Sequence, residues 1–131
     1  MRRDFSLIEE DLDFLTNLGL PWEAVRCTSG NWVVINDFPV PAGYNVTTAT
    51  VALKIDAGYP VSQIDMAYFL PHLVLQSGKA IAAVTPTQID GKNWQRWSRH
   101  RTGENPWRPG LDNISTHIQM VNFWLEREMI K

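Results

Sequence analysis

Two residues that can do chemistry together, Ser98 and His100, lie two positions apart in the stretch that is richest in arginine and tryptophan. A serine hydroxyl is scarcely ionised at neutral pH, so it needs a neighbouring base to act as a nucleophile. In an extended segment, residues i and i+2 project to the same side, so the imidazole of His100 can take the proton of Ser98 and return it. Arg99 and Arg101 can stabilise the negative charge that develops at such a site.

A simpler interpretation stands beside this hypothesis. Ser-x-His pairs are common, so Ser98 can be an ordinary loop serine and His100 a surface histidine. The single cysteine, Cys27, is a competing nucleophile, but its place on an expected strand favours a packed, inert thiol. Replacement of Cys27 by serine should therefore leave an activity of Ser98 intact.

Other ionisable residues give weaker signals. His72 and His117 are expected to be structural or solvated. A carboxylate can orient His100 as a third group, and the sequence does not choose among the three candidates, which are Asp65, Asp90 and Glu104. No Cys/His cluster has zinc spacing and no phosphate-binding glycine loop is present, so we expect no metal and no nucleotide cofactor.

Composition limits the classes of function. The 131 residues are 44% hydrophobic, which predicts one folded domain over 1–131. A net charge of −2 provides no overall attraction to nucleic acid or to an anionic membrane. The interleaved arginines and tryptophans can still stack on bases, and this third hypothesis predicts salt-dependent binding of nucleic acid. No signal peptide or membrane-length apolar stretch is seen, so a cytoplasmic protein is expected.

The elements that must position these residues begin with a helix. Apolar residues at helical spacing predict it over 8–18, with a capping box between Ser6 and Glu9 and a stop at Gly19. Short β-type runs separated by glycine or proline then predict a four-stranded antiparallel meander. The expected strands are 22–28, 31–38, 46–55 and 63–69.

The second half of the chain is less regular. Residues 71–110 resist assignment, and a segment of this length inside a small domain is usually functional. A last helix is expected over 111–129, with Asp112 as its N-cap. Helix, four-stranded meander, long irregular active-site segment and helix together predict an α+β fold.

Two motifs lie at the boundaries of these elements. Tyr59-Pro60 precedes the fourth expected strand, and Trp107-Arg108-Pro109 leads into the last helix. In this order they resemble the ubiquitin-conjugating (E2, UBC) fold over essentially the whole chain. The phrases FPVPAGY at 38–44, GK at 91–92 and QRWSRHR at 95–101 more particularly resemble the bacterial group called prokaryotic E2 family E. That group has a histidine just after its nucleophile, and His100 stands there.

The resemblance implies a function. An E2-like carrier accepts a ubiquitin-like protein from an E1-like adenylating enzyme and transfers it to a target amine. The bacterial group is also associated with JAB-type metalloproteases. Ser98 lies nine residues before Trp107, close to the place of the usual catalytic cysteine, so the implied intermediate is an oxyester on Ser98 with His100 as base. Arg99, Arg101 and Trp107 are supporting residues, and the amide of Asn93 can replace the missing asparagine of the family.

The departures from the family pattern favour an alternative. The chain has no cysteine at the catalytic place, and Thr85-Pro86-Thr87 keeps only the proline of the His-Pro-Asn motif. A catalytically inactive E2 variant that binds a ubiquitin-like protein or its E1-like partner fits these losses. Replacement of Ser98 by alanine abolishes an adduct in the first case and changes nothing in the second.

Overall fold

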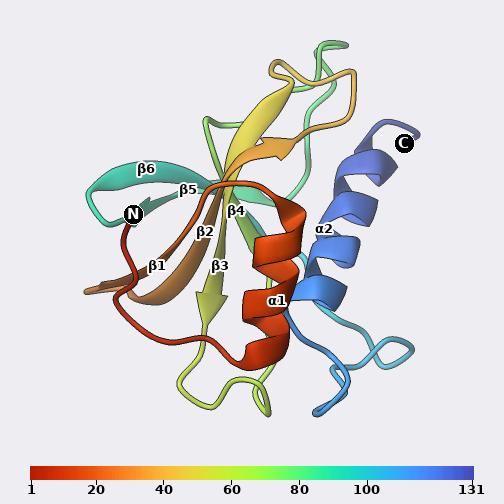
Figure 1. Cartoon of the computed structure of the whole chain (residues 1–131). Helices are drawn as coiled ribbons and strands as arrows, with labels where there is room; N and C mark the ends of the chain where they lie inside the picture. Colours follow the sequence, from red (N-terminus) through yellow and green to blue (C-terminus); the bar gives the residue numbers. More distant parts are fainter.

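The computed structural model describes residues 1–131 as two helices and six strands (Figure 1). In chain order they are α1 (Glu9–Leu18), β1 (Trp22–Cys27), β2 (Gly30–Pro39), β3 (Thr48–Ile55), β4 (Ala67–Leu70), β5 (Val84–Ile89), β6 (Lys92–Trp97) and α2 (Ile114–Glu128). The strands form one antiparallel sheet in the order β1-β2-β3-β4-β6-β5. The predicted α+β order, with a helix before and after an antiparallel sheet, is confirmed, and it is consistent with a UBC-like fold.

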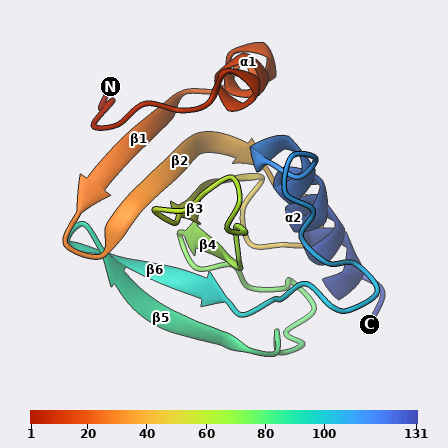
Figure 2. The same ribbon diagram turned by 90° about the horizontal axis from the view of Figure 1, so that it is seen from below.

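The main core lies between the helices and one face of the sheet. Leu15 of α1 and Leu125 of α2 are fully buried in the same cluster as Val33, Leu53 and Phe69 of the strands. Burying each such large side chain contributes about 1.5–3 kcal/mol, so this layer supplies most of the driving force for folding. The two helices lie near each other on this side of the sheet (Figures 1 and 2).

The first helix begins later than its expected cap. The N-cap is Ile8, which is extended and makes no side-chain cap hydrogen bond, so the predicted capping box of Ser6 and Glu9 is wrong. Ser6 lies two residues before the cap and is too early to reach the free amides of the first turn. The predicted stop at Gly19 is confirmed, because Gly19 has a left-handed φ of 75°.

The last helix is capped by Asn113 rather than Asp112. Asn113 accepts a hydrogen bond from the amide of Thr116 and forms a capping box with it, so α2 starts at Ile114 instead of residue 111. The prediction of Asp112 as the cap is therefore wrong. Its carboxylate instead accepts a hydrogen bond from the backbone amide of Arg108 at 2.8 Å.

A buried carboxylate ties the two helices together. Asp11 of α1 accepts hydrogen bonds from the hydroxyl of Tyr59 at 2.5 Å and from the amide of Ile114 at 3.1 Å. Burial raises the pKa of Asp11, and these two hydrogen bonds oppose the rise. The contact fixes the start of α2 against α1 and the β3–β4 loop.

The predicted irregular segment at 71–110 contains a regular hairpin, so the sheet has six strands rather than four. Asp90 and Gly91, with φ of 50° and 80°, form the two-residue turn that suits a right-twisted hairpin. β5 contains Pro86, which is tolerated there because β5 is an edge strand. The fourth expected strand is shorter than predicted and covers Ala67–Leu70.

The hairpin closes over the other face of the sheet. A second cluster of buried residues draws on all six strands; it consists of Val25, Trp32, Val34, Ala52, Tyr68, Ile89 and Trp94. Figure 2 shows the β5–β6 turn meeting the β1–β2 turn at one side of the molecule. β6 therefore runs from this closed edge toward the helices, and its last residue, Trp97, is buried in the main core.

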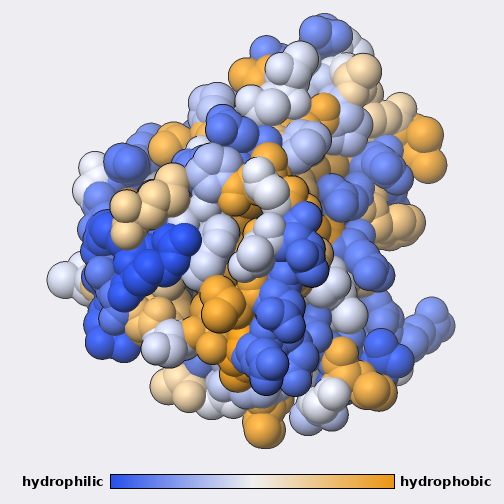
Figure 3. Space-filling model, viewed as in Figure 1, coloured by the Kyte–Doolittle hydropathy of each residue, from blue (hydrophilic) through white to orange (hydrophobic).

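The surface seen in Figure 3 is largely hydrophilic over the N-terminal segment and the outer side of α1, with a hydrophobic strip between them. Glu9, Glu10 and Asp13 of α1 are exposed. Neither helix is long and apolar enough to cross a lipid bilayer.

Candidate functional site

The candidate segment, residues 98–101, leaves the end of β6 through a tight turn. The amide of Arg99 donates to the carbonyl of Trp97 at 3.0 Å, so Ser98 is the central residue of a three-residue turn. The amide of Ser98 donates to Ala83 at 3.0 Å, and the carbonyl of Arg99 accepts from Met66 at 3.2 Å. Backbone bonds to both neighbours thus hold the half-buried Ser98 in place.

Both neighbours have unusual backbone conformations. Met66 and Ala83 have φ of 61° and 55°, in the left-handed region that side chains other than glycine rarely adopt. Each such residue costs on the order of 1–3 kcal/mol, and these residues tend to cluster at functional sites. The two hydrogen-bond partners of the segment are therefore both strained.

His100 is oriented by a carboxylate. Its Nδ1 lies 3.0 Å from each carboxylate oxygen of Asp65, which comes from the β3–β4 loop. The Nδ1 atom donates to this carboxylate, so Nε2 is left as the basic nitrogen. The imidazole side chain is 61% exposed. Asp65 was one of three carboxylates that the sequence could not distinguish, whereas Asp90 lies at the hairpin turn.

Ser98 and His100 are close in the chain but are not hydrogen-bonded to each other. The hydroxyl of Ser98 makes no hydrogen bond, and the only partner of the imidazole is Asp65. Catalytic hydrogen bonds often tighten only in the complex with substrate. The segment therefore holds a hydroxyl and an oriented imidazole two residues apart, without a hydrogen bond between them.

Arg99 is turned toward the end of α2. Its guanidinium lies 4.8 Å from the ring centroid of Trp97 and 3.7 Å from the carboxylate of Glu128, and it donates to the carbonyl of Ala82 at 3.1 Å. Its side chain is 15% exposed. Arg99 thus fastens the candidate segment to α2.

Arg101 makes a parallel arrangement at the other end of α2. Its guanidinium stacks 4.9 Å from the ring centroid of Trp107 and lies 3.6 Å from Asp112, with 6% of the side chain exposed. Burial raises the pKa of Asp112, but hydrogen bonds from Arg108 and the charge of Arg101 bring it below its ordinary value. Because most of each side chain is buried against a carboxylate, Arg99 and Arg101 brace the segment against the two ends of α2.

The two remaining predicted residues have different surroundings. Trp107 is half-buried, and its indole donates to the carbonyl of Pro60 at 3.0 Å, so it anchors the loop before α2 to the β3–β4 loop. Asn93 is exposed near the hairpin turn, opposite Gln88. It lies five residues along the strand from Ser98, about 16 Å. The structure does not bring Asn93 to the candidate site.

Of the two expectations for His117, structural or solvated, the structure shows the first. It is buried on α2, and its Nε2 donates to the carbonyl of Met66 at 2.8 Å. Burial lowers the pKa of His117 to about 4, so the ring is neutral. His117 therefore ties α2 to the strained residue beside Arg99, a link that no sequence pattern indicates. His72 lies half-buried beyond β4.

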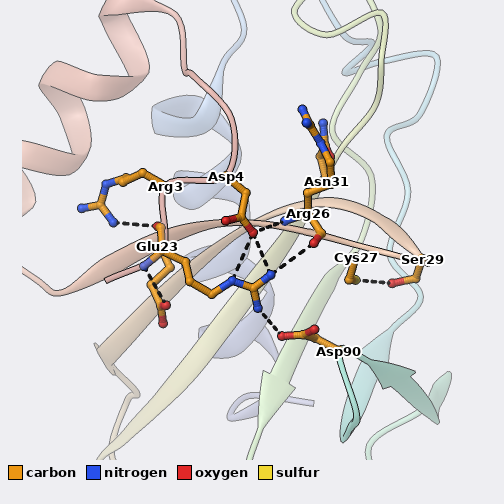
Figure 4. Close-up of polar contacts among 9 residues, drawn as sticks. Arg3, Asp4, Glu23, Arg26, Cys27, Ser29, Asn31 and Asp90 are labelled. Carbon is orange, nitrogen blue, oxygen red and sulfur yellow. Dashed lines mark hydrogen bonds and ion pairs between the residues drawn. The ribbon is translucent and has the colours of Figure 1, made fainter.

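The thiol of Cys27 is at the opposite end of β6, beside the hairpin turn (Figure 4). Its Sγ lies 3.1 Å from the hydroxyl of Ser29. Burial raises the pKa of the half-buried Cys27, but the side-chain and backbone groups of Ser29 and the backbone of Asp90 lower it overall. The sequence predicted a packed thiol, and the structure shows one that is partly accessible. The six residues of β6 separate it from Ser98 by about 20 Å.

An ion network surrounds this end of the sheet. Arg2 bonds to Asp90 at 2.6 Å and to Asp4 at 2.7 Å, and the amide of Arg26 donates to Asp4 at 2.9 Å. Arg3 pairs with Ala24 as a parallel bridge, so the N-terminal segment extends the sheet beside β1. The charged groups of this network pair with one another, and they join the β1–β2 turn to the β5–β6 turn.

Comparison with known proteins gives one match. The model of a family described as prokaryotic E2 family E matches residues 7–128. No curated protein and no solved structure matches the chain. Nowhere in the structure do three His, Cys, Asp or Glu side chains come together in a way that could hold a metal ion.

Proposed function

Because the chain belongs to prokaryotic E2 family E, whose members are E2-like proteins of ubiquitin-like conjugation, we propose that Ser98 accepts the carboxyl-terminal acyl group of a ubiquitin-like protein. The observation that carries this proposal is the imidazole of His100, held by Asp65 at 3.0 Å and placed two residues from Ser98. A hydroxyl depends on such a base more strongly than a thiol does, because a hydroxyl is far less ionised at neutral pH.

The chemistry is two acyl transfers. The hydroxyl oxygen of Ser98 attacks the thioester carbon of the charged E1-like enzyme; the carbon–oxygen bond forms, the carbon–sulfur bond breaks, and His100 passes the serine proton to the departing thiolate. An amine of the target then attacks the oxyester; the carbon–nitrogen bond forms, the carbon–oxygen bond to Ser98 breaks, and His100 moves the amine proton to the departing serine oxygen. Asp65 holds the imidazole in the required tautomer and stabilises it when it is protonated.

In this proposal the arginines position the segment. The guanidinium groups of Arg99 and Arg101 face Glu128 and Asp112, whereas the exposed imidazole of His100 faces Asp65. They fix the backbone on which Ser98 and His100 stand, instead of contacting the reacting acyl group. Trp107 supports the same segment by stacking against Arg101.

The test is a charging reaction with the cognate E1-like enzyme, ubiquitin-like protein and ATP, followed by denaturing gels and mass spectrometry. We expect an adduct that survives thiol reductant, is cleaved by mild alkali and is absent from Ser98→Ala. Cys27→Ser is the matched control and should form the adduct normally. An adduct that is sensitive to reductant and lost in Cys27→Ser would contradict the proposal.

The second candidate function is an inactive E2 variant that binds its partners without accepting the acyl group. The missing hydrogen bond between Ser98 and His100, together with the exposure of the imidazole, favours it. If the E1-like enzyme is charged and binds this chain but no covalent adduct forms, the scaffold function replaces the catalytic one.

A further inference from the structure

A small polar pocket lies between the loop before α2 and the first turns of that helix. Its volume is about 180 Å³, and the polar residues that line it are Arg101, Asn105, Arg108, Asp112, Thr116 and Gln119. We call it the arginine pocket. It is separate from the imidazole of His100, because neither His100 nor its partner Asp65 lines it.

Arg101 is incompletely paired in this pocket. The side chain is 6% exposed, and its Nε and Nη2 atoms are buried without a hydrogen-bond partner. Its nearest carboxylate oxygen, from Asp112, is 3.6 Å away and beyond a normal hydrogen bond. Because most buried polar atoms have a partner, the two unpaired nitrogens leave the guanidinium with unused hydrogen-bonding capacity beside the pocket.

The charges of the pocket show what that group is. Arg101 and Arg108 share the single carboxylate of Asp112, which leaves one positive charge in excess. A single carboxylate balances this charge and matches the planar fork of a guanidinium, and the amides of Asn105 and Gln119 can donate to it as well. A volume of 180 Å³ suits one side-chain group, because pockets for nucleotide-sized ligands are roughly 300–1,000 Å³.

The place of the pocket along the chain suggests where the carboxylate comes from. Arg101 is three residues beyond Ser98, a span of at most about 11 Å. A peptide esterified to Ser98 covers this distance with its last three or four residues. Resting on the proposed function, we propose that the arginine pocket binds an acidic side chain three or four residues before the acylated carboxyl terminus of the carried protein.

The experiment is an NMR titration of the isotope-labelled full chain with two acetylated, amidated peptides, Gly-Glu-Gly-Gly-Gly and Gly-Gln-Gly-Gly-Gly. We expect the glutamate peptide to shift the amide signals of Thr116 and Gln119 and to bind about fivefold more tightly than the glutamine peptide. Arg108→Gln should weaken the glutamate peptide by a similar factor. Arg108 is 59% exposed, so this variant should keep its fold, which its spectrum will show.

The matched control is Arg127→Gln, an exposed arginine in the last turn of the same helix, which should bind like the wild type. Equal binding of the two peptides, no shift at millimolar concentration, or equal weakening by both arginine variants would overturn the inference. Inorganic phosphate that shifts the same amides more strongly than the glutamate peptide would show an anion site that does not select a carboxylate, and would also overturn it. The titration needs no charging enzyme, and Ser98→Ala should bind the glutamate peptide normally, so its failure is distinct from failure of the proposed function.

Discussion

The two candidate nucleophiles, Cys27 and Ser98, lie near opposite ends of β6, and their surroundings differ. At the hairpin end, Ser29 and the backbone of Asp90 lower the pKa of Cys27, and the side chain of Asp90 belongs to the ion network that joins two turns. At the helix end, the amide of Ser98 bonds to the strained Ala83, and the His100–Asp65 pair lies two residues further along the chain.

The intrinsic reactivity of a side chain and its position beside a base are separate properties at these two ends. The thiol of Cys27 ionises more readily than a hydroxyl, yet no imidazole or amine is hydrogen-bonded to it; its side-chain partner is Ser29. The hydroxyl of Ser98 is intrinsically weak, yet an oriented base lies within two residues. If the chain transfers an acyl group, the position of the base should therefore determine which nucleophile is used.

The largest effect is expected at the helix end of β6, from a variant that removes the proposed base. His100→Gln removes the base and should slow oxyester formation by about 10²-fold or more, the usual contribution of a positioned base. Asp65→Asn leaves the imidazole but loses its anionic partner, so a smaller decrease is expected. The measurement is the single-turnover rate of adduct formation at saturating charged E1-like enzyme, with Cys27→Ser as the unaffected control. Normal rates in both variants would remove His100 from the mechanism.

The next effect is on stability and tests the link between α2 and the candidate segment. The folded pKa of His117 is about 4, below the ordinary value of 6.5, so the ring is neutral in both states above pH 6.5 and imposes no pH dependence there. Between pH 6.5 and 4 the unfolded chain binds the proton and the folded chain does not. Stability should therefore fall as pH decreases, by about 3 kcal/mol over this range.

Urea unfolding at several pH values from 7 to 4.5 measures this effect. His117→Gln keeps a donor for the carbonyl of Met66 and should flatten the pH dependence, although it will be less stable at pH 7. His72→Gln is the matched control, and it should retain the slope of the wild type. The same slope in all three proteins would show that other groups dominate acid unfolding.

The sequence predicted the architecture better than it predicted the contacts of the site. Helical periodicity located both helices, and β-branched runs located the first three strands. The hairpin was missed, because Pro86 and the polar residues around it hid β5, although Asp90-Gly91 is a strong signal for a two-residue turn. A propensity argument weighs residues one at a time, and only an edge position makes Pro86 compatible with a strand.

The contacts of the candidate site could also be predicted only in part from the sequence. The sequence identified His100 and three possible carboxylate partners, but the choice of Asp65 depends on the loop between β3 and β4, 35 residues away in the chain. The inward direction of Arg99 and Arg101 depends on Glu128 and Asp112 near the ends of α2. Such pairings are set by the packing of elements and have no signature in local spacing.

A smaller effect is expected from relief of backbone strain beside Ser98. Ala83 has a φ of 55°, which glycine adopts without cost, so Ala83→Gly should be neutral or stabilising by up to about 1 kcal/mol. Ala82→Gly, at the neighbouring exposed residue without a positive φ, should destabilise by a few tenths of a kcal/mol to about 1 kcal/mol. Chemical denaturation of the two variants gives the comparison, and a loss of stability in both would show that Ala83 is not strained.

The smallest effect is expected at the hairpin end. Arg2→Gln removes the ion pair with Asp90, and exposed pairs of this kind add little to global stability. The change should instead be local: the backbone amides of Gly91 and Lys92 should exchange with deuterium faster, because the turn is no longer held to the N-terminal segment. Arg26→Gln, whose side chain bonds only to Asn31, is the control and should leave the exchange at the turn unchanged. Charging of Ser98 should be equal in both variants, because the proposed transfer does not use this end of β6, which holds the sheet closed. A slower transfer in Arg2→Gln alone would mean that the two ends of the strand are coupled.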